Sequence, residues 1–370
     1  MSSSIPKTMR QLLQPSIQSP NLILTTAPIP TPTTPDDVLV RVHACSPCAG
    51  ELLWAKNFPD AIPKDKEMVP CQDLAGTVVA APADSGFGPG DRVFCRISAE
   101  RAGTAREYAL AKVGELARIS EGLGWVEAAA TPLSALTAWQ GLFVHGGLEV
   151  EGVKGNQDAR ERNARKRVLV TGAAGGVGSW VVQLAALAGA TVVAVCGTGK
   201  EEIVRKMGAS EVVDYTRMSI REWFARDSEA RMVDLVIDVV GGKTLADCWL
   251  AVRDGGNLIS VNTPPDLVKP AGLEKELAKS AFFIVEPSGS NLAEIGELIH
   301  LDRVAPVVDS VWPLEQFAQA FAKLESGHAK ANRKLYQECG WNQKPGSERG
   351  PSVLTADNSC RFLTSKCWIN

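Results

Sequence analysis

The sequence lacks two features that would indicate a membrane or a polyanion as its surroundings. No apolar stretch reaches the roughly 20 uninterrupted residues that a membrane helix needs. Basic residues are not in excess, because 39 Lys and Arg stand against 42 Asp and Glu and the net charge is −3. We therefore expect neither a membrane nor a nucleic acid as a partner.

The first residues also lack the apolar block of a secretory signal, so we expect an intracellular, cytoplasmic protein. The Ser/Thr-rich start, with Lys7 and Arg10 and no acid before Asp36, is also typical of a mitochondrial transit peptide, which is the alternative. A first β-strand at residues 21–24 is a further interpretation of the same region. The nine cysteines are scattered through a long chain, unlike the dense framework of a small secreted domain, and this predicts reduced thiols.

The length and the residue pattern predict two domains, because 370 residues exceed the roughly 250 at which single domains usually stop growing. Short β-like runs from 37 to 108, separated by Pro and Gly, predict a mostly β unit. A helical stretch follows at 125–143, and we interpret the charged segment 149–167 as a solvated loop. Apolar strands then alternate with helices, which predicts an α/β fold with a doubly wound parallel sheet. The last thirty residues, from Trp341, carry no periodic pattern.

The segment VLVTGAAGGVG predicts a strand that ends in a glycine turn before a helix. A tight turn requires glycine, a pyrophosphate requires backbone amides that no Cβ obstructs, and close packing of helix on strand requires a further small residue. A second strand ends near Gly197, at the distance expected for a ribose site, although a plain glycine turn is the alternative. The residues predicted to cradle the phosphates of a dinucleotide are Gly172, Ala174, Gly175, Gly176 and Val177.

The end of that second strand reads CGTGK and has no acid before Lys200. A carboxylate there would hydrogen-bond the ribose 2′-hydroxyl of NAD and repel a 2′-phosphate, so its lack favours NADPH. We predict that Thr198 and Lys200, just after Gly197, contact the 2′-phosphate and that Tyr215 packs on the adenosine. Alternatively, Lys200 is an ordinary solvated lysine, because the two glutamates that follow it dilute the positive field.

Four motifs in order, GPGDRVFC, EYALAKVGELARI, AAATPLSALTAWQGL and VTGAAGGVG, resemble the zinc-independent quinone oxidoreductase branch of the medium-chain dehydrogenase/reductase superfamily, over residues 8–332. The resemblance implies a GroES-like, mostly β substrate domain at residues 1–140, completed by 291–340. It implies a Rossmann domain at 141–290, and a patternless tail remains at 341–370. It also implies a cleft between the domains that holds NADPH, and a homodimer formed through the nucleotide-domain sheet.

Zinc-dependent relatives hold a catalytic metal with Cys, His and Cys, and the resemblance places Cys48, Gln72 and Leu133 at those positions. One thiolate cannot hold zinc, which requires at least three protein donors, so no metal is expected. Cys45 and Cys48 form a CxxC that we interpret as accidental, because no second CxxC completes a metal site. A redox pair is the alternative.

The resemblance also carries over further positions that contact the cofactor or wall the cleft. The implied cofactor contacts are Cys48, Thr137, Val240, Gly241, Val261 and Asn262. Phe282 and Phe283 are implied to wall the substrate cleft, with an apolar dimer edge as the alternative role. Relatives often close over the cofactor with a short Gly-Lys strand, where this chain has Asn332 and could compensate with Lys330 or Arg333.

Quinone oxidoreductases usually carry an asparagine and a tyrosine where this chain has Cys48 and Leu53. No general acid is therefore evident, the catalytic residue stays unknown, and solvent or a hydroxyl such as Ser46 would deliver the proton. Leu53 beside Trp54 suits a bulky apolar acceptor, and the alternative is that both are simply core residues.

Without zinc to polarise a carbonyl, the expected task is transfer of a hydride from NADPH to the β-carbon of an enone or to a quinone. We therefore predict a zinc-free, NADPH-dependent reductase that acts on a small apolar enone, quinone or polyketide-like substrate. Two alternatives stay open. One is a trans-acting enoyl reductase or tailoring oxidoreductase of a secondary-metabolite pathway, and the other is a catalytically idle NADPH-binding protein.

Overall fold

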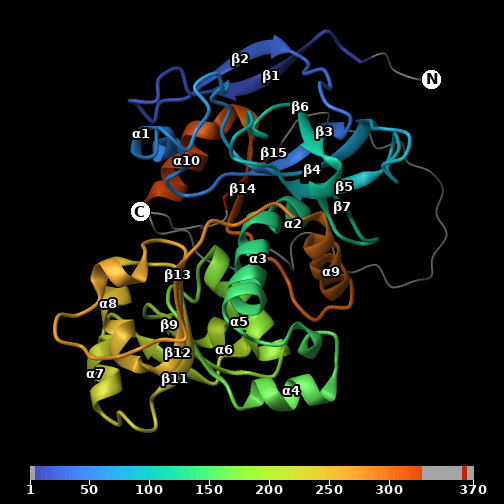
Figure 1. Ribbon diagram of the computed structural model, residues 1–370. Coiled ribbons are helices and arrows are strands. Elements are labelled where there is room, and N and C mark those ends of the chain that lie inside the picture. Colours follow the sequence, from blue (N-terminus) through green and yellow to red (C-terminus); the bar gives the residue numbers. More distant parts are fainter. Residues whose placement is uncertain (1–4, 327–360, 365–370) are drawn as a thin grey trace.

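Figure 1 shows two lobes, of which the upper consists mostly of strands and the lower contains a sheet covered by helices. The computed structural model describes residues 5–326 and 361–364. The chain builds most of the upper lobe first and enters the lower lobe along α3 (Pro132–Trp139). It later returns to the upper lobe with β14 (Ser310–Pro313) and α10 (Phe317–Glu325). A search of the described helices finds none that is long and apolar enough to cross a membrane.

The upper sheet is organised around β3 (Asp37–Ser46), most of whose residues are buried. A buried strand needs hydrogen-bonding neighbours along its length, and β3 pairs with β4, β6 and β15. The strand order is β14-β15-β3-β4-β5-β7, with β6 also paired to β3. The other strands here are β4 (Asp73–Ala80), β5 (Arg92–Arg96), β6 (Tyr108–Lys112), β7 (Ala117–Arg118) and β15 (Arg361–Thr364), and a separate two-stranded sheet holds β1 (Thr8–Leu13) and β2 (Ile23–Pro28).

Two sequence expectations concern segments at the ends of the chain. The strand expected at residues 21–24 overlaps β2, which pairs antiparallel with β1. Strand β15 lies inside the stretch 341–370, for which the sequence shows no pattern. The rest of that stretch lies outside the described residues, as do Lys330, Asn332 and Arg333.

The lower sheet contains six parallel strands in the order β10-β9-β8-β11-β12-β13. The predicted α/β fold is therefore confirmed. The order reverses between β8 and β11, and in such sheets ligands bind outside the carboxyl ends of the strands at this point. The bounds are β8 (Arg167–Val170), β9 (Thr191–Cys196), β10 (Glu211–Asp214), β11 (Val233–Asp238), β12 (Val252–Ser260) and β13 (Lys279–Phe282).

Helices cover the lower sheet because its central strands are apolar on both faces. α5 (Gly176–Leu187) buries Trp180, Val181 and Leu184 and packs against α3 as well as against the sheet. The remaining helices are α1 (Trp54–Asn57), α2 (Trp125–Ala129), α4 (Gln157–Ala164), α6 (Glu201–Lys206), α7 (Ile220–Ala225), α8 (Gly242–Ala251) and α9 (Gly289–His300).

The charged segment 149–167, expected to be a solvated loop, instead contains helix α4. Asn156 caps this helix, since its side-chain oxygen accepts a hydrogen bond from Ala159 N at 2.9 Å. Asn163 anchors the far end, where its amide donates to Ala188 O at 3.0 Å. The expectation was wrong because polar caps and one buried amide, rather than an apolar face, hold the helix.

Candidate functional site

The predicted glycine cradle forms the turn between β8 and α5. Gly172 has a φ of 57°, which glycine adopts without strain, and Gly175 N donates to Gly172 O at 2.8 Å. Gly178 lies so close to this turn that a Cβ atom there would be 2.2 Å from Gly172 O. The turn therefore requires glycine at position 172 because of its backbone conformation, and at position 178 because no Cβ atom fits there.

The start of α5 offers backbone amides to a ligand. Gly175 is the N-cap and Gly176 the first helical residue, so the first amides of a twelve-residue helix have no partner within the helix. Ala174 lies in the same turn, whereas the Val177 side chain is buried and leaves only its backbone for a ligand. This arrangement fits the diphosphate of a dinucleotide.

The loops after β11 and β12 meet the glycine turn at the carboxyl edge of the sheet. A Cβ atom at Gly172 would lie 2.8 Å from Val239 Cγ2 and 3.2 Å from Val240 Cγ2. A Cβ atom at Gly241 would lie 2.1 Å from Asn262 Oδ1. Residues that the sequence placed in one cofactor crevice are thus neighbours in space.

A buried carboxylate, Asp238, holds these loops together. It accepts hydrogen bonds from Thr171 Oγ1 at 2.7 Å, Ser260 Oγ at 3.0 Å and Gly241 N at 2.9 Å. Ser260 Oγ in turn accepts from Asn262 N at 3.1 Å. Burial raises the pKa of Asp238, and the hydrogen bonds from Thr171 and Ser260 oppose that rise. Because the group touches three loops, it fixes the shape of the crevice floor.

The expected ribose corner forms where β9 and β10 end. Tyr215 is 62% exposed, and its ring lies across Gly197, where a Cβ atom would be 3.1 Å from the Tyr215 hydroxyl. The Thr198 hydroxyl donates to Asp214 Oδ2 at 2.6 Å, and Arg217 Nε lies 3.3 Å from the same oxygen. Burial opposes ionisation of Asp214, but hydrogen bonds from Thr198 and a neighbouring threonine outweigh it and lower its pKa. Asp214 is therefore ionised, and its oxygens are already engaged.

Lys200 stands at the same corner, at the N-cap of α6. Its carbonyl accepts from Val204 N at 3.1 Å, and Gly199 N donates to Glu201 Oε2 at 2.8 Å. The corner thus contains two cations, Lys200 and Arg217, and two carboxylates, Glu201 and Asp214. The local sequence indicated the glutamates beside Lys200 but not Asp214 and Arg217, which lie about fifteen residues later in the chain.

In the upper lobe, one carboxylate bridges the two loops that hold Cys48 and Gln72. Glu51 accepts hydrogen bonds from Cys48 N at 3.2 Å and from Cys71 N at 3.0 Å. Glu325 of α10 accepts from Gly50 N at 2.9 Å, so the late part of the chain supports the same loop. Burial raises the pKa of Glu51 to about 7, although the two amide hydrogen bonds lower it.

The upper lobe is tied to α3 by Asp73, the residue after Gln72. Its buried carboxylate accepts from Leu133 N at 2.9 Å, at the N-terminal end of α3, where a negative charge is favourable. One turn later Thr137 is buried and donates its hydroxyl to Leu133 O at 2.6 Å. Since α3 packs on α5, Asp73 links the substrate lobe to the helix that carries the glycine turn.

The donors at the three zinc-ligand positions do not fit a zinc ion. Cys48 offers a thiol, but Gln72 is an amide and Leu133 is apolar, while zinc requires at least three N, S or carboxylate donors. The nearby carboxylates of Glu51 and Asp73 accept hydrogen bonds from backbone amides. Within residues 5–326 and 361–364, no group of three or more His, Cys, Asp or Glu side chains could hold a metal ion.

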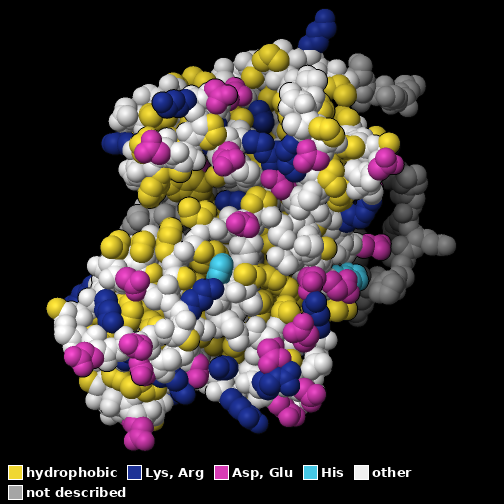
Figure 2. Space-filling model, in the orientation of Figure 1, with side chains coloured by type: hydrophobic (Ala, Val, Ile, Leu, Met, Phe, Trp, Pro, Cys, Tyr) yellow, Lys and Arg dark blue, Asp and Glu magenta, His cyan; other side chains and the backbone are white. Residues whose placement is uncertain are grey.

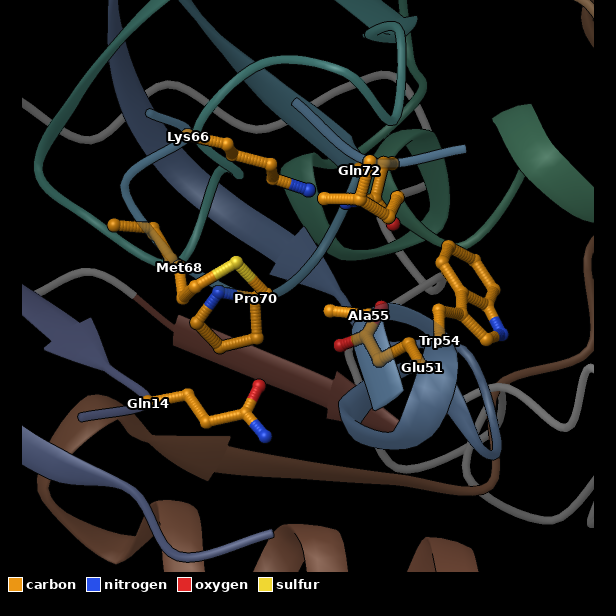
Figure 3. A pocket seen from close by; sticks show the side chains of 10 residues that line it. Gln14, Glu51, Trp54, Ala55, Lys66, Met68, Pro70 and Gln72 are labelled. Carbon is orange, nitrogen blue, oxygen red and sulfur yellow. The ribbon is translucent and has the colours of Figure 1, made fainter. Parts of the chain in front are cut away.

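A small cavity lies beneath α1, between this helix and the start of β4 (Figure 3). Its volume is about 20 Å³, enough for one water molecule and too small for an organic substrate. Its polar lining comes from Glu51, Lys66, Gln72 and Gln14, and Trp54 covers one side. Burial lowers the pKa of Lys66, and the charge of Glu51 opposes this.

The other predicted positions are distributed as follows. Ser46 and Cys48 are buried, whereas Leu53 is exposed and Trp54 is half-buried. Val261 is buried, and its backbone amide donates to Asp238 O at 3.0 Å. Phe282 is 38% exposed on β13, while Phe283 is buried, with its ring centroid 4.4 Å from that of His145. The two phenylalanines therefore face different surroundings, and only Phe282 presents a substantial surface.

The buried acids Glu51, Asp73 and Asp238 were not among the residues expected from the sequence. The signal for Asp238 is an acid inside the otherwise apolar run LVIDVV, which predicts a carboxylate with fixed partners. Glu51 and Asp73 give no such signal, because their partners are backbone amides on distant segments.

Comparison with known proteins places this geometry among dehydrogenases. Residues 34–135 match the family model described as alcohol dehydrogenase GroES-like domain, and residues 207–331 match zinc-binding dehydrogenase. A probable zinc-binding oxidoreductase, mitochondrial, of Arthroderma benhamiae is 47% identical over 88% of this chain and 95% of its own. The mouse NAD(P)H oxidoreductase RTN4IP1, mitochondrial, is 30% identical over 80% of both chains. A quinone oxidoreductase structure from Coxiella burnetii superposes with a TM-score of 0.69 over 88% of this chain and 98% of that one, at 21% identity.

Proposed function

The chain belongs to the medium-chain dehydrogenase/reductase family of nicotinamide-dependent oxidoreductases, and on this premise we propose that it is a zinc-free, NADPH-dependent reductase of enones or quinones. One observation carries the proposal. A glycine turn and neighbouring loops that fit a dinucleotide occur in the same chain as zinc-ligand positions that hold Gln72 and Leu133. A hydride acceptor that needs no metal to polarise it is the chemistry that such a site supports.

The cofactor would lie along the carboxyl edge of the lower sheet. The amides at the start of α5 would hold the diphosphate, and Val240, Gly241 and Asn262 would line the nicotinamide side, on the floor that Asp238 fixes. When bound, the nicotinamide supplies a hydride. The chain's own residues bind it, orient it and keep water from the reacting face, which can lower such a barrier by about 7 kcal/mol.

We infer a preference for NADPH over NADH from the charges at the ribose corner. No acid ends β9, and Asp214, at the end of β10, already accepts from Thr198 and lies beside Arg217. Thr198, Lys200 and Arg217 are the candidate partners for a 2′-phosphate, which would compete with Asp214 for the hydroxyl and the guanidinium. A guanidinium and an ammonium favour a dianionic phosphate over a neutral hydroxyl.

The acceptor is proposed to be small and apolar. Leu53 is 39% exposed, and Trp54, the next residue in the chain, is half-buried. Figure 2 shows apolar side chains on the facing parts of both lobes, at the left of the waist between them. Such walls bind an apolar acceptor and exclude water, whereas they offer little to a charged one.

The experiment follows NADPH absorbance in the presence of purified protein and a panel of enones and quinones. We expect oxidation with at least one acceptor and at least ten-fold tighter binding of NADPH than of NADH. Binding of NADPH without turnover of any acceptor would favour an idle nucleotide-binding protein instead. Turnover confined to enoyl thioesters would favour the enoyl reductase alternative.

Two variants test the cofactor corner, with a third as the control. Lys200→Ala and Arg217→Ala should each weaken NADPH binding about five- to ten-fold and leave NADH binding unchanged. Lys206→Ala is the matched control, because this lysine sits later on the same helix and pairs with Glu202 on its exposed side. Equal affinity of the wild type for the two cofactors would refute the 2′-phosphate argument.

Two further proposals concern location and assembly. We propose a mitochondrial location over a cytoplasmic one, because the names of the fungal and mouse relatives both carry that compartment. Fractionation of cells that express the tagged chain tests this, and a purely cytosolic signal would contradict it.

We also propose a homodimer through β13, the edge strand of the lower sheet.

A further inference from the structure

The proposed reduction leaves negative charge on the acceptor's carbonyl oxygen, and few of the expected cleft residues can donate a hydrogen bond to it. The Thr137 hydroxyl donates to Leu133 O within α3. The Cys48 thiol donates to Ala49 O at 3.7 Å, and Leu53 is apolar. Trp54 Nε1 and Asn262 Nδ2 are buried donors without a partner among the described residues, and the amide of Gln72, at a zinc-ligand position, is a further neutral donor.

Gln72 is held firmly by its neighbours. Cys71 has a φ of 67°, unusual for a residue other than glycine, and its amide donates to Glu51. Ile97 N donates to Gln72 O at 2.9 Å. Asp73, on the other side, accepts from the start of α3. A strained residue persists only where its surroundings over-determine it, so the backbone at position 72 has little freedom.

The residues around the Gln72 side chain also constrain its amide group. The residue is 3% exposed, and its Oε1 has no hydrogen-bond partner in the part of the chain that the structure describes. It lines the water-sized cavity together with Lys66 and Glu51 (Figure 3). A buried carbonyl oxygen without a partner is unfavourable, and one ordered water in the cavity would satisfy it.

The cavity sets which way the amide points. Lys66 and Glu51 both line the cavity, but the Glu51 oxygens already accept from the amides of Cys48 and Cys71. The cation of Lys66 therefore favours the carbonyl oxygen on that side over the NH₂ group. The oxygen and nitrogen of an amide diverge from the same carbon, so fixing the oxygen at the cavity turns the NH₂ group away from it. Trp54, expected at the cleft, lines the same cavity as Gln72, so the cavity and the expected acceptor wall share a residue.

We propose that Gln72 donates a hydrogen bond from Nε2 to the carbonyl oxygen of the acceptor, and that a water in the cavity beneath α1 holds its amide in this orientation. The inference rests on the proposed function. As hydride reaches the β-carbon, the electron pair of the C=C bond moves to give an enolate, with its charge on the oxygen that Gln72 contacts. A proton from solvent water then completes the saturated ketone. An amide thereby takes over the stabilising contact that zinc supplies in zinc-dependent relatives.

The test compares Gln72→Leu and Gln72→Glu with the wild type, using an enone that the wild type reduces. We expect the single-turnover hydride-transfer rate to fall about 10- to 100-fold in Gln72→Leu, with NADPH affinity unchanged. Gln72→Glu should lose rate at pH 8 and regain it on acidification, because only a protonated carboxyl donates. NADPH affinity that stays constant over the same pH range would distinguish this rescue from the reversal of a structural disturbance.

A second readout does not depend on turnover. The carbonyl stretch of the bound, ¹³C-labelled saturated ketone should shift to lower frequency in the wild type, relative to the ketone in apolar solvent. Gln72→Leu should abolish that shift. The matched control is Gln183→Leu, because the Gln183 amide holds the backbone of Ala305 far from the cleft. Its hydride-transfer rate and carbonyl stretch should match those of the wild type.

Two outcomes would overturn the inference while leaving the proposed function intact. One is a wild-type rate in Gln72→Leu, and the other is an unshifted carbonyl stretch in the wild-type complex. If Gln72→Leu fails to fold, the near-isosteric Gln72→Glu alone decides through its pH profile, and a flat profile contradicts the proposal. Failure of the proposed function looks different, since the wild type would then bind NADPH and reduce no acceptor.

Discussion

At the scale of single residues, buried charges and rings in the upper lobe are held by contacts that link distant strands. His43 on β3 stacks on Trp125 with ring centroids 4.4 Å apart, and its Nε2 lies 2.9 Å from Thr77 Oγ1. Burial, with Arg41 and Arg92 nearby, lowers the pKa of His43 to about 4. The folded protein therefore keeps this ring neutral in mildly acidic solution.

This lowered pKa predicts a loss of stability in acid. Between about pH 6.5 and pH 4 the unfolded chain binds a proton at His43 that the folded chain does not, so the free energy of unfolding falls as pH falls. We expect His43→Gln to remove this contribution. The difference in unfolding free energy between wild type and variant should change by about 1–2 kcal/mol from pH 7 to pH 4.5, a range reduced for partial solvent exposure.

The measurement is denaturant unfolding of both proteins at a series of pH values. His300→Gln is the control, because this histidine is exposed at the end of α9 and should not alter the pH dependence. If the wild type and His43→Gln lose stability in parallel on acidification, His43 is not the source of the acid sensitivity.

At the scale of elements, the turn from β8 into α5 determines whether the lower lobe can bind a diphosphate. The helix start must press against the strand end so that its amides face the ligand. Gly178 permits this approach, since any side chain there would collide with Gly172 O. The same contact explains the spacing of Gly172 and Gly178, the first and last of the four glycines in this segment.

Gly178→Ala should therefore push α5 away from the turn. The new Cβ would lie 2.2 Å from Gly172 O and 2.8 Å from Ala173 Cα, both backbone atoms that cannot yield easily. We expect a loss of about 1–3 kcal/mol in stability and at least ten-fold weaker NADPH binding. Thermal unfolding and fluorescence titration with NADPH measure the two effects.

Gly88→Ala serves as the comparison, because nothing lies within 4 Å of a Cβ atom there. Its stability and NADPH affinity should stay close to those of the wild type. If Gly178→Ala binds NADPH as tightly as Gly88→Ala does, the close approach of helix to strand is not required for binding.

At the scale of the whole molecule, the lower sheet has an open edge. β13 pairs with β12 on one side and, among the described residues, with no strand on the other. Phe282 lies on this strand, and Ile284, two residues further on, is 68% exposed. An unpaired edge bearing apolar side chains is a surface that another strand can extend.

This edge predicts the oligomeric state. We expect the wild type to sediment as a dimer of 39.5 kDa chains and Ile284→Lys to sediment as a monomer, because a charge would be buried at the interface. Leu301→Lys is the control, since Leu301 is 54% exposed at the end of α9, away from β13. A monomeric wild type at micromolar concentration would refute the dimer.

Much of the fold could be predicted from local patterns. The alternation of apolar strands and helices predicted the parallel sheet, and the glycine motif predicted the turn at Gly172 to Gly178. The charged helix α4 was not predictable from periodicity, because its stability comes from the Asn156 cap and the Asn163 amide. At the ribose corner, the sequence indicated Lys200 but not Arg217, which reaches it only through the pairing of β10 with β9.

By itself, the sequence determined the glycine turn, the α/β fold and the replacement of two zinc-ligand positions by Gln72 and Leu133, because backbone conformation and donor chemistry are properties of the residues themselves. Only the tertiary structure decided which groups are neighbours. It brought Glu51 to the amides of Cys48 and Cys71, and it enclosed a water-sized cavity beside Gln72. Burial and partner choice depend on segments far apart in the chain, so no local pattern contains them.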